Sequence, residues 1–410
     1  MICDLLPQSY PEHLSLPLLG SVLDEFDDWL VAQGYRFNSR QCYVLRCTAI
    51  EAYFHRRKQH SLAALTSKSL QQCWQYHRRR QGGISAAVRC LQRFLLDKQI
   101  LPAPEPPADG PFVATLDAYR QYLLDVRGLA PITIDQHGVT ACQLLQHQLA
   151  MDHAFRLADL SQARIERFVT DAGKRYGRGT LQHVVAQIRG FLRFLTMRGE
   201  APVGLDRQID TPRVYRLEQL PRALQWDTVC ALLESIDRTS AGGLRDYAIF
   251  LLIATYGLRG CDVAGLTLND IDWRSGELHV CQSKTSQPLS LPLTDPVADA
   301  LLAYLRDARP SVAFRQVFIT VPAPILPIKR QTVGYAFRYR VMRSGLDIRY
   351  RGVHCLRHSY ALHLLRQGVS LKTIGDLLGH RSTQSTCVYL RLDLDDLREV
   401  ALPLPGETAS

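Results

Sequence analysis

The chain has 410 residues, which is too long for one compact core, so two or three domains are expected. Lys and Arg exceed Asp and Glu by 49 to 39, and the net charge of +10 favours a polyanionic partner, either nucleic acid or an anionic membrane surface. The longest apolar run, 248–258, is too short to span a bilayer, and the N-terminus carries no secretory-signal pattern. The eleven cysteines include no CxxC pair and no zinc-ligand spacing, so we expect a soluble cytoplasmic protein with neither metal nor cofactor.

Two helical segments open the chain. Residues 1–100 and 112–200 both carry apolar residues at three- and four-residue spacing, which predicts bundles of four or five helices. Three stretches of the first segment are similar in sequence to three stretches of the second, and this alignment pairs Phe94 with Phe194. We therefore predict that the N-terminal domain duplicates the second one. Between them, residues 101–111 carry five prolines in eleven positions, which indicates an extended linker.

A third domain, 225–410, follows a second linker over 201–224 and includes a C-terminal tail. Alternating residues between 269 and 293, broken by turn residues at Ser275–Gly276 and at 283–287, predict a small antiparallel sheet. Helices are predicted over 226–236, 244–256, 296–308, 333–342, 356–367 and 371–378. The predicted fold class is thus mainly α with a small antiparallel β-sheet in the third domain of a multi-domain chain.

Six polar residues of the third domain stand at predicted helix edges or at a hairpin tip rather than on apolar faces. Taken singly, each has a structural explanation: an arginine can pair with a nearby carboxylate, and most tyrosines are packing residues. Together, two arginines, a lysine, two histidines and a late tyrosine suit the breaking of a phosphodiester by a protein hydroxyl. The set comprises Arg259, Lys284, His354, Arg357, His380 and Tyr389.

From about residue 225 to residue 397, the chain resembles the catalytic domain of tyrosine recombinases, the phage integrase family. "GLRGCDVAGL" is similar to the first-arginine box of that family, with Asp262 where the family commonly has Glu or Asp. "HCLRHSYA" is similar to its His-x-x-Arg box, and "LGHRSTQSTCVY" is similar to its Gly-His…Tyr box. Residues 112–200 are similar to the family's helical core-binding domain, whereas residues 1–100 have no counterpart in its minimal two-domain members.

The chemistry of phosphodiester cleavage explains these residue types. Attack creates a pentacoordinate phosphorane with additional negative charge on its non-bridging oxygens. The guanidinium groups of Arg259 and Arg357 could hold both oxygens bidentately and stay charged at any relevant pH. Such preorganised charge is usually the largest catalytic contribution.

Tyr389 is the expected nucleophile, and its attack would form a 3′-phosphotyrosyl bond and release a 5′-hydroxyl. A phenol with a pKa near 10 needs a base, for which His354 is the first candidate. The resemblance implies that Lys284 is the acid for the leaving 5′-oxygen, and His380 would bind a phosphate oxygen or orient the site. Because the phosphotyrosine keeps the bond energy, another 5′-hydroxyl can reseal the strand without ATP.

The resemblance implies a site-specific recombinase or integrase acting on double-stranded DNA at a specific core site, and hence a nucleoid-associated protein. It also implies a homo-tetramer on two duplexes, acting alone or with other recombinases. An additional N-terminal domain favours a role in a mobile element over chromosome-dimer resolution. Two alternatives stay open: a catalytically silent DNA-binding accessory subunit, and a type IB-like topoisomerase that relaxes supercoils without a partner site.

Overall fold

The structure is a computed structural model, and two compact units make up the chain. One unit combines Met1–Ala103 with Leu220–Ser410, and the other is Pro104–Gln219. Parts of both predicted linkers, residues 103–109 and 215–221, and the tail beyond residue 392 lie outside the described residues. The described residues are 2–78, 80–102, 110–214, 222–284, 288–350, 352–380 and 382–392.

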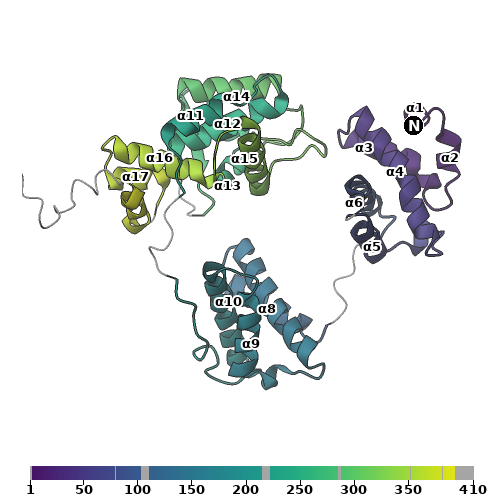
Figure 1. Cartoon of the computed structure of the whole chain (residues 1–410), viewed down its shortest axis with the longest axis horizontal. Helices are drawn as coiled ribbons and strands as arrows, with labels where there is room; N and C mark the ends of the chain where they lie inside the picture. Colours follow the sequence, from purple (N-terminus) through teal and green to yellow (C-terminus); the bar gives the residue numbers. More distant parts are fainter. Residues whose placement is uncertain are drawn as a thin grey trace, which may run out of the picture. The chain divides into compact units, whose positions relative to one another are not determined.

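The N-terminal part of the first unit is a helical bundle with its own hydrophobic core, in which Phe26, Phe54 and Phe94 are fully buried. It ends with Gln99 at a φ of 56° and with the buried Leu101. Its elements are α1 (Ile2–Leu5), α2 (Tyr10–Leu14), η1 (Gly20–Val22), α3 (Leu23–Ala32), α4 (Phe37–His55), η2 (Leu62–Ala64), α5 (Ser67–Arg78) and α6 (Gly82–Asp97), drawn in purple and dark blue in Figure 1.

The second unit is also helical, and it repeats the order of α3 to α6. Phe194 is buried in α10 as Phe94 is in α6, and Gly199 has a φ of 70° where Gln99 has 56°. The alignment of the two sequences is therefore also an alignment of their elements. The elements of this unit are α7 (Val113–Asp125), α8 (Pro131–Met151), η3 (Leu157–Asp159), α9 (Gln162–Gly173) and α10 (Arg178–Met197).

The C-terminal part of the first unit is mainly helical with one small sheet, which confirms the predicted fold class. The prediction missed the short helix α13, and α16 begins at His354, two residues before the predicted start. The helices are α11 (Trp226–Glu234), α12 (Ala241–Tyr256), α13 (Gly260–Gly265), α14 (Asp295–Asp307), α15 (Arg330–Ser344), α16 (His354–Arg366) and α17 (Leu371–Leu378), with 3₁₀ turns η4 (Leu268–Asp270), η5 (Thr383–Ser385) and η6 (Cys387–Leu392).

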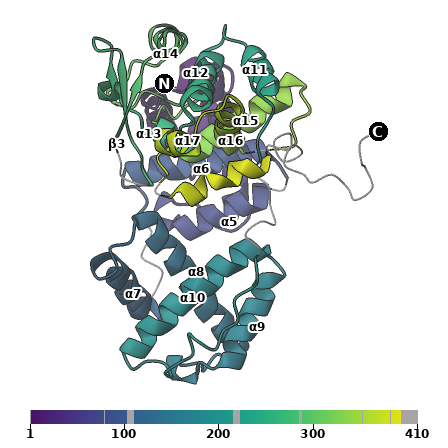
Figure 2. The ribbon, with the colours of Figure 1, turned by 90° about the vertical axis from the view of Figure 1, so that its left-hand side faces the viewer.

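The sheet has three antiparallel strands in the order β1 (Ile271–Asp272), β2 (Glu277–Cys281) and β3 (Pro288–Pro292). Leu278 of β2 pairs with Leu291 of β3, and both side chains are buried in the same core as α12 and α14. The sheet stands beside these helices in Figure 2. The β2–β3 connection begins with Gln282, Ser283 and Lys284.

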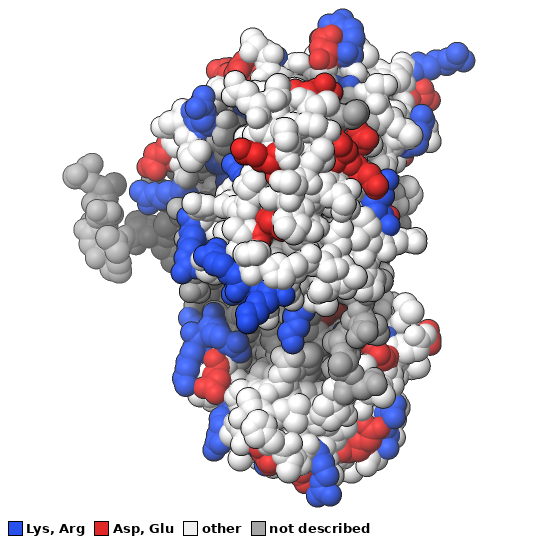
Figure 3. Space-filling view, turned by 90° about the vertical axis from the view of Figure 1, so that its right-hand side faces the viewer, with Lys and Arg blue, Asp and Glu red and all other residues white. Residues whose placement is uncertain are grey.

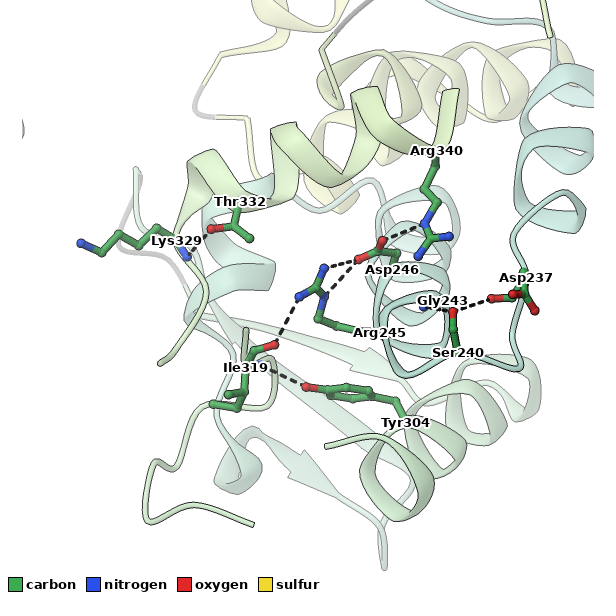
Figure 4. Close-up of polar contacts among 10 residues, drawn as sticks. All are labelled: Asp237, Ser240, Gly243, Arg245, Asp246, Tyr304, Ile319, Lys329, Thr332 and Arg340. Atoms are coloured by element: carbon green, nitrogen blue, oxygen red, sulfur yellow. Dashed lines mark hydrogen bonds and ion pairs between the residues drawn. The ribbon is translucent and has the colours of Figure 1, made fainter. Parts of the chain in front are cut away.

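Helix α12 is fixed by a buried ion-pair network (Figure 4). Asp246 accepts hydrogen bonds from Arg245 at 2.7 and 3.0 Å through one carboxylate oxygen, and from Arg340 of α15 at 2.8 Å through the other. The side chain of Asp246 is only 3% exposed. At the start of the helix, the Ser240 hydroxyl caps the N–H of Gly243. These contacts hold α12, so its C-terminal end at Gly257 has a defined position.

We expect Asp246→Ala to destabilise α12 by about 3–5 kcal/mol, because it leaves two buried guanidinium groups without their carboxylate. The measurement is hydrogen–deuterium exchange of the α12 amides, which reports the free energy of opening. The matched control is Asp307→Ala, because Asp307 pairs with Arg306 on the surface, where the arginine side chain is 80% exposed. The control should change the exchange by less than about 1 kcal/mol. Equal effects of the two substitutions would contradict this account of α12.

Candidate active site

Arg357 is the best-fixed polar side chain of the candidate site. It lies in the first turn of α16, is 2% exposed, and donates from Nη1 to the carbonyl oxygen of Gly257 at 2.6 Å and from Nη2 to that of Leu378 at 2.7 Å. These carbonyls stand at the C-terminal ends of α12 and α17, where helix dipoles place partial negative charge. Two of its five N–H groups are thereby used, and the others are left for an anion.

Both helix ends require glycine. Gly257 and Gly379 have φ values of 64° and 61°, in the left-handed region where other residues are strained. A Cβ on Gly257 would lie 2.6 Å from Leu378 Cδ2 and 2.7 Å from Tyr360 Cδ1, and one on Gly379 would overlap the amide of Gln282. The close approach of α12, α16 and α17 around Arg357 therefore depends on these two glycines.

Arg259 is held beside Arg357 by a short chain of contacts. It is the residue before α13, and its Nη1 donates to Gln282 Oε1 at 2.7 Å. The Nε2 atom of Gln282 donates in turn to the Leu378 carbonyl at 3.3 Å, which also accepts from Arg357, so Gln282 links the two arginines. Burial, together with the nearby charge of Arg259, lowers the pKa of Arg357 to about 10.

Asp262 links the first arginine to the lysine hairpin. Its carboxylate lies 3.9 Å from Arg259 Nη1, and it accepts hydrogen bonds from the backbone N–H and the hydroxyl of Ser283, at 2.9 and 2.7 Å. Ser283 immediately precedes Lys284, which is exposed at the start of the β2–β3 turn. The sequence offered Asp262 as a partner of Arg259 as well as a family position, and the structure adds its contact with Ser283.

The two predicted histidines border the arginines. His380 Nδ1 lies 2.8 Å from the hydroxyl of the buried Thr386, and burial together with the charges of Arg357 and Arg259 lowers its pKa to about 4. The pKa of His354 is also lowered, by partial burial and by the charges of Arg357, Arg259, Arg330 and Lys284. His354 is also exposed to solvent at the start of α16. Both imidazoles are neutral near pH 7.

Tyr389 is 2% exposed, with its ring packed against Ala361, Ile374 and Leu378 of α16 and α17. Its hydroxyl lies 3.0 Å from Nδ1 of His358, a residue that the sequence prediction missed. Burial raises the pKa of the Tyr389 hydroxyl, while Arg357 and Arg259 act to lower it. His354 and His358 lie one turn apart on α16, with ring centroids 4.6 Å apart.

All six predicted residues thus lie in or beside one cluster. Arg259, Arg357, His380 and Tyr389 are joined electrostatically, and the charge of Lys284 reaches His354. His358 was missed because the sequence pattern singled out only the first histidine of "HCLRH". The i, i+4 spacing of His354 and His358 was the available signal. Chemically, the cluster combines two fixed cations with a phenol and neutral imidazoles, which suits a phosphate anion.

The structure adds two negative observations on the described residues. Among them, no group of three or more His, Cys, Asp or Glu could hold a metal ion. Within the same ranges, no helix is long and apolar enough to cross a membrane.

Comparison with known proteins identifies the family. The model of the phage integrase family matches residues 222–395. A protein of Sinorhizobium fredii named as an integrase/recombinase, y4rA, is 33% identical over 401 residues, which cover 96% of this chain and 97% of the relative. The chain belongs to the phage integrase family. The tyrosine recombinase XerC of Pelobacter propionicus is 28% identical over 291 residues, 71% of this chain and 94% of that protein.

The fold agrees with this membership. A lambda integrase tetramer bound to a Holliday junction superposes with a TM-score of 0.52 at 17% identity, and the match covers 76% of this chain and 86% of the integrase. The resemblance that the sequence predicted is therefore confirmed. The recombinase is an enzyme of the tyrosine type, which breaks and rejoins DNA strands.

Gly379→Ala is expected to lower DNA cleavage at least 10-fold, because the new methyl displaces Gln282 and so loosens both arginines. The matched control is Gly368→Ala, since Gly368 also has a left-handed φ, 78°, but has open space around its Cβ position. Both variants carry the backbone cost of about 1–2 kcal/mol, so only the loss of the Gln282 contact separates them. The measurement is the yield of covalent protein–DNA adduct on a nicked duplex. Equal yields would refute the role of Gln282.

Proposed function

We propose that the protein exchanges DNA strands at a specific core site through a 3′-phosphotyrosyl intermediate at Tyr389. One observation carries the proposal: the Tyr389 hydroxyl is held at 3.0 Å from an imidazole and close to the two guanidinium groups. A buried tyrosine with no chemical role needs only one ordinary hydrogen-bond partner. Here the surrounding cations serve no structural need of the phenol, whereas they suit the charge of a phosphorane.

Arg259 and Arg357 would bind the non-bridging oxygens of the scissile phosphate. Arg357 is already oriented by two carbonyls and Arg259 by Gln282, so little reorganisation is needed when the charge develops. His380, fixed by Thr386, would donate to the same phosphate. This arrangement supplies positive charge from side chains alone, which supports a reaction independent of metal ions.

The reaction replaces one P–O bond with another, and each proton that is released or taken up has a named partner. Tyr389 Oη forms a bond to phosphorus and loses its proton to a histidine, while the P–O5′ bond breaks and O5′ takes a proton from Lys284. The sequence-based candidate for the histidine is His354. In the reverse direction, a different 5′-hydroxyl attacks the phosphotyrosine, so the strand is resealed without ATP.

The quaternary and biological roles are also proposals. The lambda integrase structure is a tetramer on a Holliday junction, which supports a homo-tetramer on two duplexes here, alone or with other recombinases. The domain boundaries at 1–100, 112–200 and 225–410 stay predictions, as does the core-binding role of the second unit. We propose service in a mobile element, because the N-terminal bundle goes beyond what minimal strand exchange needs.

Tyr389→Phe should abolish the covalent adduct completely, because it removes the attacking oxygen and keeps the ring packing. The substrate is a nicked duplex carrying the site that the protein selects from a random-sequence library. Digestion and mass spectrometry of the wild-type adduct should place the DNA on Tyr389. An adduct that survives the substitution, or no wild-type adduct, would contradict the proposal. Relaxation of plasmids without a specific site would favour the topoisomerase alternative.

A further inference from the structure

The basic residues of the N-terminal bundle are concentrated in its α4 to α6 part. From the start of α4 to the end of α6, residues 37–97, there are eleven Lys and Arg against two Asp and Glu, a net charge of +9. The rest of residues 1–100 adds two basic and six acidic residues, so the bundle as a whole carries +5 of the chain's +10. The corresponding stretch of the second unit, α8 to α10, residues 131–197, has eight against five, a net charge of only +3. The α4 to α6 part of the N-terminal bundle is therefore more basic than the corresponding part of the second unit.

The two acidic residues of this stretch do not neutralise its surface. Glu51 is 6% exposed and accepts hydrogen bonds from the backbone N–H groups of Leu18 and Leu19, at 2.9 and 3.0 Å. Asp97 accepts one from Trp29 Nε1 at 2.8 Å. Both carboxylates thus hold the bundle together, and the exposed arginines face solvent without them.

Several of these arginines lie on aromatic rings. Arg57 lies 3.8 Å from the ring centroid of Tyr53, Arg80 lies 4.2 Å from that of Tyr76, and Trp74 has arginines at 4.1 and 5.0 Å. The same region is hollowed by a groove of about 1020 Å³. We name it the arginine–aromatic surface, formed by Tyr53, Arg57, Trp74, Tyr76, Arg78, Arg80 and Arg89.

Figure 3 shows Lys and Arg side chains gathered on one flank of the N-terminal part, while the acidic side chains of that view lie mostly elsewhere. Stacking on the aromatic rings restricts the orientation of the guanidinium groups. The arginines therefore lose less conformational entropy when they bind a ligand. The groove is lined with Gln72 and Gln75 as well, which are hydrogen-bonding groups. A membrane-binding surface would instead present apolar anchors.

We propose that the arginine–aromatic surface is a second DNA-binding surface, which binds the phosphate backbone of duplex DNA outside the cleaved core. The inference rests on the proposed DNA function but concerns a different part of the chain. Guanidinium groups match phosphate oxygens bidentately, and each neutralised phosphate releases condensed counterions. The surface thus contributes sequence-independent affinity.

The test uses the full chain as Tyr389→Phe, so binding is measured apart from cleavage. The probe is a random-sequence duplex longer than the core site, and the readout is the salt dependence of affinity by fluorescence anisotropy. Arg57→Ala, Arg78→Ala and Arg80→Ala combined should reduce the slope of log affinity against log salt by roughly 2 to 3, about 0.9 for each phosphate contact. The combined Lys variant at the same positions keeps the charge and should keep the slope.

A second variant tests the surface without the risk that the alanine substitutions unfold the bundle. Gln72→Glu with Gln75→Glu adds two negative charges at exposed positions of the groove and removes no packing. This Glu variant should weaken DNA binding, as the Ala variant does. An unchanged slope in the Ala and Glu variants would overturn the proposal, as would binding to anionic phosphatidylserine vesicles in preference to DNA. Neither result would change the yield of the covalent adduct at Tyr389. The DNA-binding surface and the proposed function are therefore tested independently.

A different observation carries a second inference, on the proton of Tyr389. Nδ1 of His358, not a nitrogen of His354, lies within hydrogen-bond distance of the Tyr389 hydroxyl. The His354 ring packs against that of His358 and is open to solvent, so the two histidines connect the buried hydroxyl with the outside. The geometry points to His358 as the group that accepts the Tyr389 proton during attack and returns it during resealing.

The proton balance is complete within the proposed reaction. Oη passes its proton to His358 as the O–P bond forms, and Lys284 protonates O5′ as the P–O5′ bond breaks. The groups facing His358 are His354, Arg357, His380 and Tyr389. Burial and the first three of these groups lower the pKa of His358 to about 4, so the free imidazole is neutral and able to accept. The phosphate between the arginines offsets their charge and thereby stabilises the protonated ring.

His358→Gln should lower the cleavage rate by roughly 100- to 10,000-fold, because Gln can hydrogen-bond the phenol but cannot take its proton. A 5′-bridging phosphorothiolate substrate separates the two proton transfers, since a thiolate leaves without an acid. That substrate should rescue Lys284→Ala and leave His358→Gln slow. DNA binding of the Gln variant should equal that of Tyr389→Phe.

The matched control is His363→Gln, in the same helix, because His363 stacks on Trp226 with ring centroids 4.0 Å apart and its Nε2 lies 3.1 Å from the amide of Gln367. It should cleave at the wild-type rate. Wild-type cleavage by His358→Gln would overturn the assignment, and so would its rescue by the phosphorothiolate, which would place His358 at the leaving group.

Discussion

The hydrogen bonds of Arg357 to two helix C-termini are the constraint on which the site depends. The carbonyls of Gly257 and Leu378 belong to α12 and α17, and the arginine itself belongs to α16, so one buried guanidinium fixes three helices together. Left-handed glycines make the close approach possible. Burying a cation costs solvation energy unless strong acceptors repay it. Here the acceptors are carbonyls, which leave the positive charge uncancelled.

This positive charge affects the protonation of the histidines and the tyrosine around it. Asp262, the carboxylate nearest to the arginines, is turned toward Ser283 and lies 3.9 Å from Arg259, so the cluster keeps a positive field. The field helps to keep the imidazoles of His358 and His380 neutral, and it acts against the rise in the pKa of Tyr389. A phosphodiester placed between the arginines would reverse these effects. The site therefore has its charges arranged for an anion before any anion is bound.

The sequence pointed to the residues that the structure brings together, but not to most of the contacts that hold them in place. Arg259, Lys284, His354, Arg357, His380 and Tyr389 belong to short motifs whose spacing is visible in the chain. Helix α17 was predicted with the observed ends, because Ser370 caps its start and Gly379 its end. Gln282 could not be predicted, because its role arises from a long-range approach of the β2–β3 turn to Leu378. His358 had a visible spacing, but only the folded position of Tyr389 shows what it contacts.

The central claim is that Arg357 is held by protein carbonyls and therefore already oriented before DNA arrives. The most direct test is a crystal structure of the recombinase on an uncleaved nicked duplex of its selected site. We predict that Arg357 keeps its bonds to Gly257 and Leu378 and contacts the scissile phosphate with its remaining N–H groups. An arginine that has left both carbonyls to reach the phosphate would contradict the account.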